Sequence, residues 1–331
     1  MNHTNNGRST EYITTGPIMS QVGVIGLGRM GRAFAQLLMA GGLRVVAYDI
    51  DADKVSAVLS QGAVAAASVE DFNRCDMVLT SLPDDNAVRK AVLSEKGLAS
   101  YLKPGGIHLS TSTIGVPFCR ELDAAHRERG QVLIAMPVLG NPDLAARRGL
   151  FLLLGAPLDA IERSRDVIDL LGQRSFHVGD DPWLASAMKL AGNMLTAATL
   201  QSMGEVFAFL SKEGITPHKA QQILTGSLFD GKVHKTYGGR IVERRYSPPG
   251  MTVPLATKDL RLLLAEAEQT HTPMPLASLL HDRLIAVEAR GWSDLDWSAL
   301  GRLAAFEASI PEELSTPVEN GSKFRLKIPQ P

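Results

Sequence analysis

Apolar runs of strand length alternate with longer segments of helical periodicity through the first half of the chain. Repetition of this pattern is typical of consecutive strand–helix units. Such units place their strands parallel and cover both faces of the sheet with helices, so we expect a doubly wound parallel α/β domain. The expected strands are Gln21–Ile25, Arg44–Asp49, Met77–Leu82, Ile107–Ser110, Val132–Met136, Leu150–Leu154 and Ser175–Val178, and the expected helices include Met30–Ala40, Asp84–Leu93, Val116–Arg129 and Leu158–Leu171.

The pattern changes at Asp181-Pro182, where the aspartate suits a helix N-cap and the proline the first helical position. No Gly–Pro break follows until Lys212-Glu213-Gly214, which predicts one helix of about 30 residues, about 45 Å long. The rest of the chain to about Ser309 has an all-helical pattern. Breaks are expected at Thr216-Pro217, Gly238-Gly239, Pro248-Pro249-Gly250 and Thr272-Pro273.

These changes divide the chain into four parts: a disordered tail over residues 1–18, an α/β domain over residues 19–180, a helical domain over residues 181–309 and a loose tail over residues 310–331. The first tail has no apolar stretch of the kind found in secretory signals, and Met19 is the expected natural start. A length of 331 residues suits two domains, each with its own core.

Composition excludes several classes of protein. The 34 basic and 35 acidic side chains leave no positive excess for binding nucleic acid. The longest apolar run, near Leu150–Leu154, is far too short to span a membrane, and the 8 histidines show no metal-ligand spacing. Cys75 and Cys119 fit free buried thiols in a reducing compartment. We therefore expect a cytoplasmic protein without nucleic-acid, membrane or metal partners.

A glycine-rich turn separates the first expected strand from the first expected helix. In such a turn the first glycine permits a tight bend, the second lets the backbone approach a pyrophosphate, and the third lets the helix pack closely on the strand. The N-terminal amides of the helix then face the phosphates. This context predicts a Rossmann-type dinucleotide site formed by Gly26, Leu27, Gly28, Arg29, Met30 and Gly31.

The second expected strand ends in Asp49, 18 residues beyond Gly31. A carboxylate at this place can accept both hydroxyl groups of the adenosine ribose, and it repels a 2′-phosphate. The neighbouring Ile50 and Asp51 supply no arginine that would hold such a phosphate. NAD(H) is therefore favoured over NADP(H) as the cofactor.

Lys189 and Asn193 are four residues apart near the start of the long expected helix, so they share one face. The adjacent Met188 and Leu190 are apolar. A lysine in such surroundings is often a surface residue with a buried stem, and this interpretation stays open. Its position favours function, because a helix that begins where a nucleotide domain ends starts beside an interdomain cleft, where ligands usually bind.

Six motifs occur in the order and spacing of the β-hydroxyacid dehydrogenases, and the chain resembles this family from Gln21 to about Ala305. The family includes 3-hydroxyisobutyrate dehydrogenase, tartronate semialdehyde reductase and the glyoxylate/succinic semialdehyde reductases. The motifs are Gly26–Gly31, Leu82-Pro83, Ser110-Thr111, Pro137-Val138-Leu139-Gly140, Lys189 with Asn193, and Lys258-Asp259-Leu260.

The resemblance implies that Lys189 is the catalytic lysine and that Asn193 orients the substrate. It also implies that Leu82-Pro83 and Thr111 line the nicotinamide side of the cofactor, and that Lys258 reaches cofactor or substrate from the helical domain. The chemistry is consistent, since one amine with a pKa near working pH can take a proton from an alcohol and return it to a carbonyl. Partial burial, the positive nicotinamide and the second lysine would each lower that pKa.

The expected substrate loop departs from the family pattern of Pro-Val-Ser-Gly-Gly, whose serine and amides bind a substrate carboxylate. This chain has Leu139, Gly140, Asn141 and Pro142 there. The amides of Gly140 and Asn141, and the Asn141 side chain, can still bind an anion. Leu139 either indicates a more apolar or bulkier substrate or only packs the loop, and both interpretations stay open.

Other positions bear on related families. Trp183 and Ala185 replace a Gly-x-Gly pair and make the cleft wall bulkier, and Ile114 replaces a proline. The 6-phosphogluconate dehydrogenases have a glutamate seven residues after the lysine, where this chain has Thr196. Imine reductases usually replace the lysine by Asp or Tyr and prefer NADP. The retained lysine and Asp49 argue against that activity, whereas the bulky leucine and tryptophan support it.

Three further features complete the expectations. His234 and Tyr237 stand in a glycine-rich connection, Asp230–Arg240, which either reaches the cleft or forms a surface loop. The pair Arg147-Arg148 is expected to be solvated, near enough to the substrate loop to attract an acid. Apolar residues around Leu195–Leu210 predict more apolar surface than one domain covers, and the resemblance implies a homodimer or homotetramer joined through helical domains.

The sequence thus predicts an NAD(P)-dependent oxidoreductase that moves a hydride between a nicotinamide cofactor and a small molecule, a β-hydroxy acid or its semialdehyde. Lys189 is the expected general acid and base. The alternatives are an imine or ketone reductase of the same fold and a dinucleotide-binding regulatory protein with an inactive site. The presence of both Lys189 and Asn193 argues against an inactive site.

Overall fold

A nine-stranded sheet occupies the first half of the part of the chain described by the computed structural model, residues 21–311. The strand order is β3-β2-β1-β4-β5-β6-β8-β7, with β9 paired to β8. The strands are β1 (Gln21–Ile25), β2 (Arg44–Tyr48), β3 (Val64–Ala65), β4 (Met77–Thr80), β5 (Ile107–Ser110), β6 (Val132–Ala135), β7 (Val138–Leu139), β8 (Phe151–Gly155) and β9 (Arg174–Gly179).

The strands from β3 to β6 are parallel, which confirms the mainly parallel sheet. The chain order reverses between the neighbouring β1 and β4, and ligands bind outside the carboxyl ends of strands at such a reversal. Two pairings depart from the parallel pattern, because β8 runs antiparallel to both β6 and β7. Only the short helix α6 (Pro142–Ala145) lies between β7 and β8, so no crossover helix returns the chain in the parallel direction.

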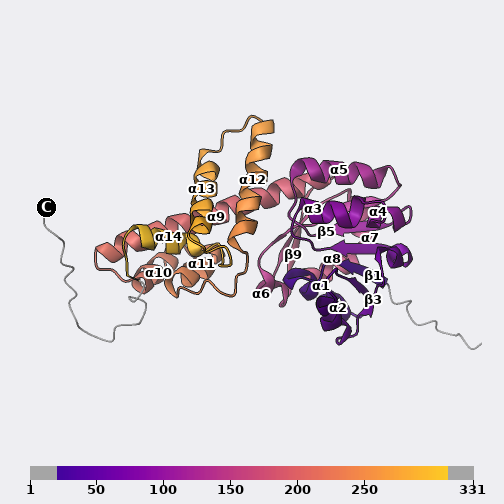
Figure 1. Ribbon diagram of the computed structural model, residues 1–331, viewed down its shortest axis with the longest axis horizontal. Coiled ribbons are helices and arrows are strands. Elements are labelled where there is room, and N and C mark those ends of the chain that lie inside the picture. Colours follow the sequence, from indigo (N-terminus) through magenta and orange to yellow (C-terminus); the bar gives the residue numbers. More distant parts are fainter. Residues whose placement is uncertain (1–20, 312–331) are drawn as a thin grey trace, which may run out of the picture.

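Helices cover both faces of this sheet (Figure 1). Phe34, Leu38 and Ile168 belong to the core on one face, and Phe118 and Leu122 belong to the core on the other. The helices are α1 (Arg29–Ala40), α2 (Ala52–Leu59), α3 (Asp85–Val88), α4 (Leu98–Tyr101), α5 (Val116–Arg127), α6, α7 (Leu158–Arg163) and α8 (Arg165–Leu171), with the 3-10 turn η1 (Val69–Arg74) and the π-helical turn η2 (Arg89–Leu93).

Two of the expected helices are divided. The segment Asp84–Leu93 changes from α3 to the π-helical turn η2 at Arg89. The segment Leu158–Leu171 is interrupted at Ser164, which ends α7 and precedes α8. The buried Ser164 hydroxyl donates to the carbonyl of Ala160 at 2.9 Å, a local bond of the kind that competes with regular helix geometry.

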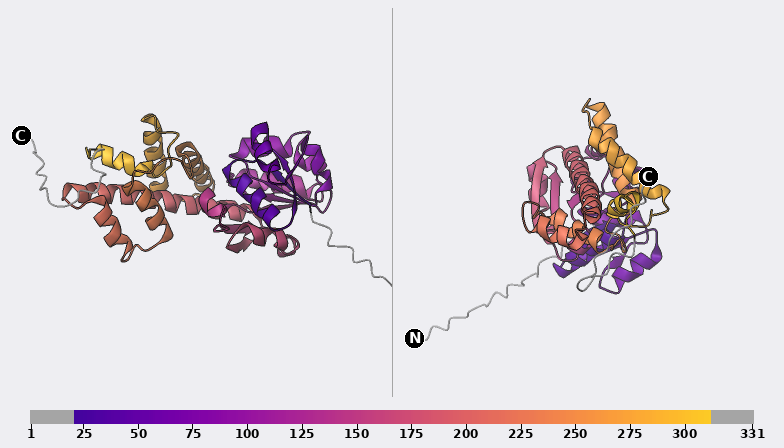
Figure 2. Two further views of the ribbon diagram at one scale, coloured as in Figure 1. Left: turned by 90° about the horizontal axis from the view of Figure 1, so that it is seen from below. Right: turned by 90° about the vertical axis from the view of Figure 1, so that its left-hand side faces the viewer.

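The long helix begins and ends as expected. Helix α9 (Pro182–Lys212) has 31 residues and runs from the sheet into the helical bundle (Figures 1 and 2). Asp181 is its N-cap residue, although the Asp181 side chain makes no capping hydrogen bond. The other helices are α10 (Pro217–Thr225), α11 (Lys232–Val242), α12 (Val253–Gln269), α13 (Pro275–Ala289) and α14 (Ala299–Glu307).

The expected break at Gly238-Gly239 is wrong, because α11 continues through both glycines. A Cβ atom on Gly238 would lie 2.2 Å from Oε1 of Gln221 on α10. The glycine therefore permits close packing of two helices and does not end one. The other expected breaks are confirmed: Thr216-Pro217 forms the start of α10, and Pro248–Gly250 and Thr272-Pro273 lie between helices.

We call residues 21–179 the sheet half and residues 182–307 the helical half. The expected tails, residues 1–18 and most of 310–331, lie outside the described residues. Cys75 and Cys119 are free and buried, as expected, and burial raises the pKa of Cys119 to about 12. Within residues 21–311, no helix has the length and apolar character needed to cross a membrane.

Candidate active site

The glycine turn lies at the carboxyl end of β1, beside the point where the strand order reverses. Gly26 has a φ of 90°, and a Cβ atom there would lie 2.4 Å from the carbonyl oxygen of Ser81. A Cβ atom on Gly31 would lie 1.8 Å from the carbonyl oxygen of Gly26, whereas one on Gly28 would meet no atom of residues 21–311 within 4 Å. The outer glycines are needed for internal packing, and the middle one faces open space. The turn therefore fits the pyrophosphate of a dinucleotide.

Asp49 follows β2 and lies against this turn. Its Oδ2 accepts a hydrogen bond from the Leu27 amide at 2.7 Å, and its Oδ1 accepts one from the Asp51 amide at 2.9 Å. A carboxylate oxygen can accept more than one hydrogen bond, so both oxygens keep capacity for ribose hydroxyl groups. The turn and the acidic residue, far apart in sequence, thus form one cradle.

The structure places Lys189 in a row of buried, hydrogen-bonded polar side chains. The residue is 8% exposed, and its Nζ donates to Oδ1 of Asn193 at 2.9 Å across one turn of α9. Nδ2 of Asn193 donates in turn to Oδ2 of Asp259 on α12 at 2.5 Å. The other carboxylate oxygen of Asp259 lies 3.0 Å from Nζ of Lys258. The two lysines are therefore joined through one amide and one carboxylate.

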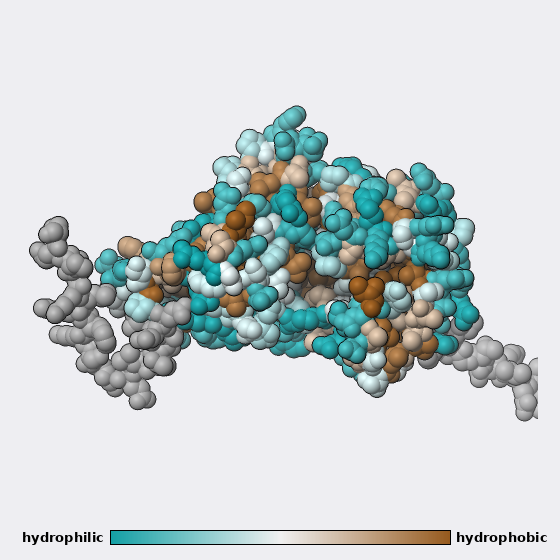
Figure 3. Space-filling view, in the orientation of Figure 1, coloured by the Kyte–Doolittle hydropathy of each residue, from teal (hydrophilic) through white to brown (hydrophobic). Residues whose placement is uncertain are grey.

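Lys258 connects this row of side chains to the sheet half. Its Nζ donates to the carbonyl oxygens of Pro83 at 3.0 Å and Thr113 at 2.6 Å, in the segments that follow β4 and β5. Ser112 ties these two segments together, because its hydroxyl accepts from the Leu82 amide at 2.9 Å. The structure thus brings Lys258 to the segments expected to line the nicotinamide, and connects Asn193 and Lys189 to it through Asp259. In Figure 3 apolar residues are visible beside the depression between the two halves.

Thr111 has a more specific arrangement than expected. Its hydroxyl donates to the carbonyl oxygen of Thr80 at 2.8 Å, and the residue is 8% exposed. Because its proton is used within the sheet half, the Thr111 hydroxyl keeps only acceptor capacity for a ligand in this arrangement.

Sequence reasoning missed Asp259 as a site residue. The signal was present, because Asp259 shares a helix face with Ala256, Leu260 and Leu263, all of them buried. An acidic residue on an apolar helix face is costly to bury unless it has charged or hydrogen-bonding partners. Such a residue beside Lys258 therefore indicates a buried polar partner from another helix.

Burial lowers the pKa of Lys189 to about 8. The positive charge of Lys258 lowers it as well, while the negative charge of Asp259 opposes both effects. Burial and Lys258 act in the expected direction. Near neutral pH the side chain consequently has access to both amine and ammonium forms, as a group that gives and takes one proton requires.

The substrate-loop residues approach α9 from the sheet half. Leu139 lies in β7, and its Cδ2 is 3.0 Å from where a Cβ atom on Gly192 would be, between Lys189 and Asn193 along the helix. The Asn141 side-chain oxygen accepts from the Leu144 amide at 2.9 Å and caps α6. The side-chain oxygen of Asn141, a residue expected to bind an anion, is therefore used to cap α6.

The remaining departures from the family pattern take different positions. Trp183 stacks under the guanidinium of Arg120 on α5, 4.1 Å from the ring centre. Ile114 is 1% exposed and belongs to the core of the sheet half. The Thr196 hydroxyl donates to the carbonyl of Gly192 at 2.9 Å, within its own helix.

His234 and Tyr237 lie on helix α11, so the glycine-rich connection predicted for this segment is wrong. Tyr237 packs edge-on against Trp297 in the helical half, and burial raises the pKa of Tyr237 to about 12. His234 packs against Phe229. Within residues 21–311 neither side chain makes a hydrogen bond or ring contact with the row of polar side chains that contains Lys189 and Asp259.

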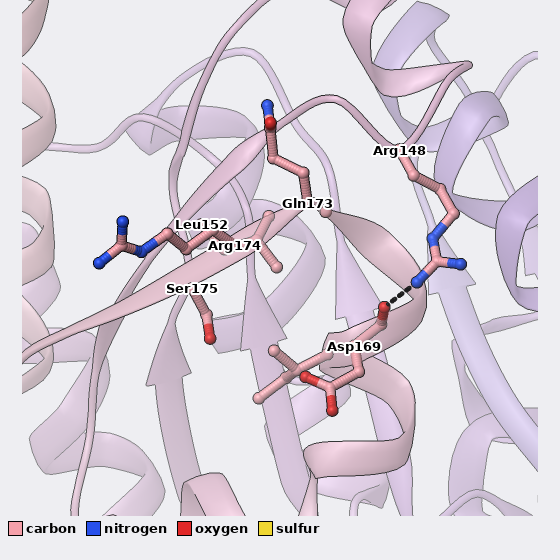
Figure 4. Close-up of a pocket in the computed structure, with 8 residues that line it drawn as sticks. Arg148, Leu152, Asp169, Gln173, Arg174 and Ser175 are labelled. Atoms are coloured by element: carbon pink, nitrogen blue, oxygen red, sulfur yellow. Dashed lines mark hydrogen bonds between the residues drawn. The ribbon is translucent and has the colours of Figure 1, made fainter.

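Arg147 and Arg148 are exposed, as expected for a solvated pair, and Arg148 also makes a hydrogen bond at the surface. It donates to the carbonyl oxygen of Asp169 beside a hollow of about 170 Å³ at β8, α8 and β9 (Figure 4). Gln173, Arg174 and Ser175 also line this hollow. None of the site residues described above contributes to it.

Comparisons with known proteins cover both halves. Residues 21–179 match the NAD binding domain of 6-phosphogluconate dehydrogenase, and residues 184–304 match the family described as NAD-binding of NADP-dependent 3-hydroxyisobutyrate dehydrogenase. The oxidoreductase YfjR of Bacillus subtilis is 34% identical over 281 residues, which is 85% of this chain and 98% of that protein. The NAD-dependent L-serine dehydrogenase of Pseudomonas aeruginosa is 28% identical and covers 86% of this chain and 98% of its own.

Solved structures show the same fold. The 3-hydroxyisobutyrate dehydrogenase of Mycobacterium tuberculosis with L-serine has a TM-score of 0.78 and 25% identity, over 86% of this chain and 99% of that one. An imine reductase from Myxococcus stipitatus in complex with NADP⁺ is less similar, with a TM-score of 0.59 and 22% identity over 85% of this chain and 99% of that one. The second likeness concerns the fold alone.

Proposed function

The chain belongs to the β-hydroxyacid dehydrogenase family and is a nicotinamide-dependent oxidoreductase, and from this premise we propose a specific reaction. The enzyme moves a hydride between NAD(H) and a β-hydroxy acid or its semialdehyde, with Lys189 as general acid and base. The observation that supports this most is the buried contact of Lys189 with Asn193, joined through Asp259 and Lys258 to the segments after β4 and β5. The division into a dinucleotide domain over residues 19–180 and a substrate and dimerisation domain over residues 181–309 is part of the same proposal.

A bound nicotinamide accepts or supplies the hydride. In oxidation the neutral amine of Lys189 takes the hydroxyl proton, and in reduction its ammonium form returns a proton to the carbonyl oxygen. Asn193 has a fixed orientation, since its Nδ2 donates to Asp259 and its Oδ1 must then face Lys189. Lys258 holds the Pro83 and Thr113 segments against the helical half, which helps to exclude water from the reacting groups.

We also propose a preference for NAD(H) over NADP(H). Asp49 supports it, because the carboxylate is anchored on the glycine turn by the Leu27 amide and would repel a 2′-phosphate. Leu27, Arg29 and Met30 complete the cradle between the three glycines of the turn.

A second candidate function is an imine or ketone reductase of the same fold. The observation in its favour is Leu139, which packs at Gly192 beside Lys189 and puts an apolar side chain near the proposed reacting groups. The amides of Gly140 and Asn141 remain the proposed anion-binding groups for a hydroxy acid. If Leu139 limits the binding of small hydroxy acids, the substitution Leu139→Ser should raise kcat/KM for them. Measuring kcat/KM for hydroxy acids of increasing carbon-chain length tests this.

The decisive assay is a steady-state panel of hydroxy acids, semialdehydes and cyclic imines, each with NAD(H) and with NADP(H). Turnover of hydroxy acids or semialdehydes with NAD(H) supports the first proposal. Turnover of imines alone would favour the second candidate. Lys189→Ala, which retains the dinucleotide cradle, is the background control for the panel.

We further propose a homodimer or homotetramer in the cytoplasm. The support for association is the exposed apolar side of α9, where Leu195 is 66% exposed and Phe209 is 63% exposed, with Met188 on the same helix. Burying such residues in a second copy removes apolar area from water. Multi-angle light scattering at micromolar concentration tests the proposal, and a stable monomer would contradict it.

A further inference from the structure

Arg29 makes contacts that its place in the glycine turn does not explain. It is the first residue of α1, yet its Nη1 donates to the carbonyl oxygen of Pro249, in the loop between α11 and α12 of the helical half. Its Nη2 lies 3.6 Å from a carboxylate oxygen of Asp143 on α6, just beyond the substrate loop. One side chain therefore joins the phosphate cradle, the substrate-loop region and the helical half.

The loop of residues 247–251 is firmly held from the helical side. Asp296 is fully buried, and its Oδ2 accepts from the amide of Gly250 at 2.8 Å. Arg240, 5% exposed, lies 3.6 Å from the same Asp296 oxygen and donates to the carbonyl of Pro248 at 3.4 Å. A buried ion pair with several hydrogen bonds gives the loop a defined shape, so a contact made at Pro249 restrains the helical half as a body.

The same loop also bears on the substrate loop. A Cβ atom on Gly250 would lie 3.5 Å from Cβ of Asn141. Asn141 follows Leu139 and Gly140 and caps the helix that contains Asp143. Arg29 therefore contacts the region where the cradle, the substrate loop and loop 247–251 lie side by side.

The guanidinium retains donors for an anion. It has five N–H groups, and the contacts with Pro249 and Asp143 involve only its two terminal nitrogens. Arg29 directly follows Gly28, the glycine that faces open space, and its side chain is 44% exposed and accessible. Charge-assisted bonds from a guanidinium to phosphate oxygens are among the stronger hydrogen bonds in proteins.

We propose that Arg29 is a latch between the two halves, which binds the pyrophosphate of the dinucleotide while it holds Pro249 and Asp143 against the cradle. Dinucleotide binding and closure of the crevice at loop 247–251 then strengthen each other, because coupling between two binding events is reciprocal. This assigns Arg29 a positioning role beyond its backbone place in the glycine turn, and it rests on the dinucleotide-binding part of the proposed function.

The test uses full-length protein and two readouts other than activity: NADH affinity from fluorescence titration, and hydrogen exchange of loop 247–251 with and without NADH. The variants are Arg29→Ala and Arg29→Lys. Arg32→Ala is the matched control, because Arg32 is exposed on the same helix and lies outside the contacts described above. Thermal unfolding of each variant verifies that it is folded.

We expect Arg29→Ala to weaken NADH binding by about tenfold or more and to abolish the protection that NADH gives to loop 247–251. Arg29→Lys should recover part of the affinity, since it keeps the charge, but little of the protection, since a lysine cannot bridge several partners in the same way. Arg32→Ala should resemble the wild type in both readouts.

Two results would overturn the latch. Equal NADH affinity in Arg29→Ala and Arg32→Ala would show that Arg29 does not bind the pyrophosphate. Weaker affinity with unchanged loop protection would show a phosphate ligand without coupling between the halves. A wild-type protein that binds no dinucleotide at all would instead refute the proposed function itself, so the two failures are distinguishable.

Discussion

Removal of the Asp259 charge should shift the pH dependence of the reaction in a direction that the structure specifies. Asp259 is joined to Lys189 through one amide, with hydrogen bonds of 2.9 Å and 2.5 Å on its two sides. For charges about 7 Å apart at an effective dielectric constant of about 20, the attraction is on the order of 2 kcal/mol. Asp259→Asn removes this attraction and retains an oxygen that can accept from Asn193, so the shape of the site is largely kept.

The sign follows from the charge that is lost. The Asp259 carboxylate favours the ammonium form of Lys189, so its removal lowers the pKa of Lys189 further below its wild-type value of about 8. The ratio of amine to ammonium at a given pH then changes by more than about tenfold. Oxidation, which needs the amine, should reach its plateau at a lower pH, and reduction, which needs the ammonium, should decline from a lower pH.

The assay is kcat/KM in both directions from about pH 6 to about pH 10, with the best substrate of the panel. Asp282→Asn is the matched control, because the Asp282 side chain on α13 is 81% exposed. An unchanged profile in Asp259→Asn, or a shift to higher pH, would refute the reasoning that couples this carboxylate to the catalytic amine.

Three further predictions concern the chemistry, the cofactor and the stability of the sheet half. Lys189→Ala should lower kcat by on the order of 10²- to 10⁴-fold, with NADH affinity within about twofold of the wild type, as stopped-flow hydride transfer and fluorescence titration will show. Asp49→Ser should narrow the preference for NAD over NADP, measured as the ratio of the two kcat/KM values, mainly through tighter NADP binding. His126 is buried between His108, at 2.9 Å, and Gln131, at 2.7 Å, and burial lowers its pKa to about 4. The unfolded chain therefore binds more protons than the native one between about pH 6.5 and about pH 4, so the free energy of unfolding should fall by about 3 kcal/mol as pH decreases across this interval. Urea unfolding at a series of pH values measures this change. A free energy of unfolding that stays constant across the interval would be incompatible with a neutral buried pair.

Features that depend on short stretches of sequence were predicted well. The glycine turn between strand and helix and the start of α9 at Pro182 are where the pattern indicates, because turn and capping chemistry act over a few neighbouring residues. The errors arose where distant segments decide local geometry. Gly238 and Gly239 form a typical break in sequence, but they stay within α11, where Gly238 permits close packing against Gln221 of α10. The antiparallel pairing of β8 with β6 and β7 does not follow from the order of strands and helices alone.

The amino-acid sequence by itself determined the alternation of strands and helices, the cradle with its acidic neighbour, and the shared helix face of Lys189 and Asn193. Each of these depends on spacing along the chain. Only the tertiary structure decided that Asp259 and Lys258 of α12 meet that face, and that Arg29 reaches Pro249 on the helical half. Burial and the charges of remote helices set the pKa of Lys189, and no local pattern specifies how two halves of a chain pack against each other.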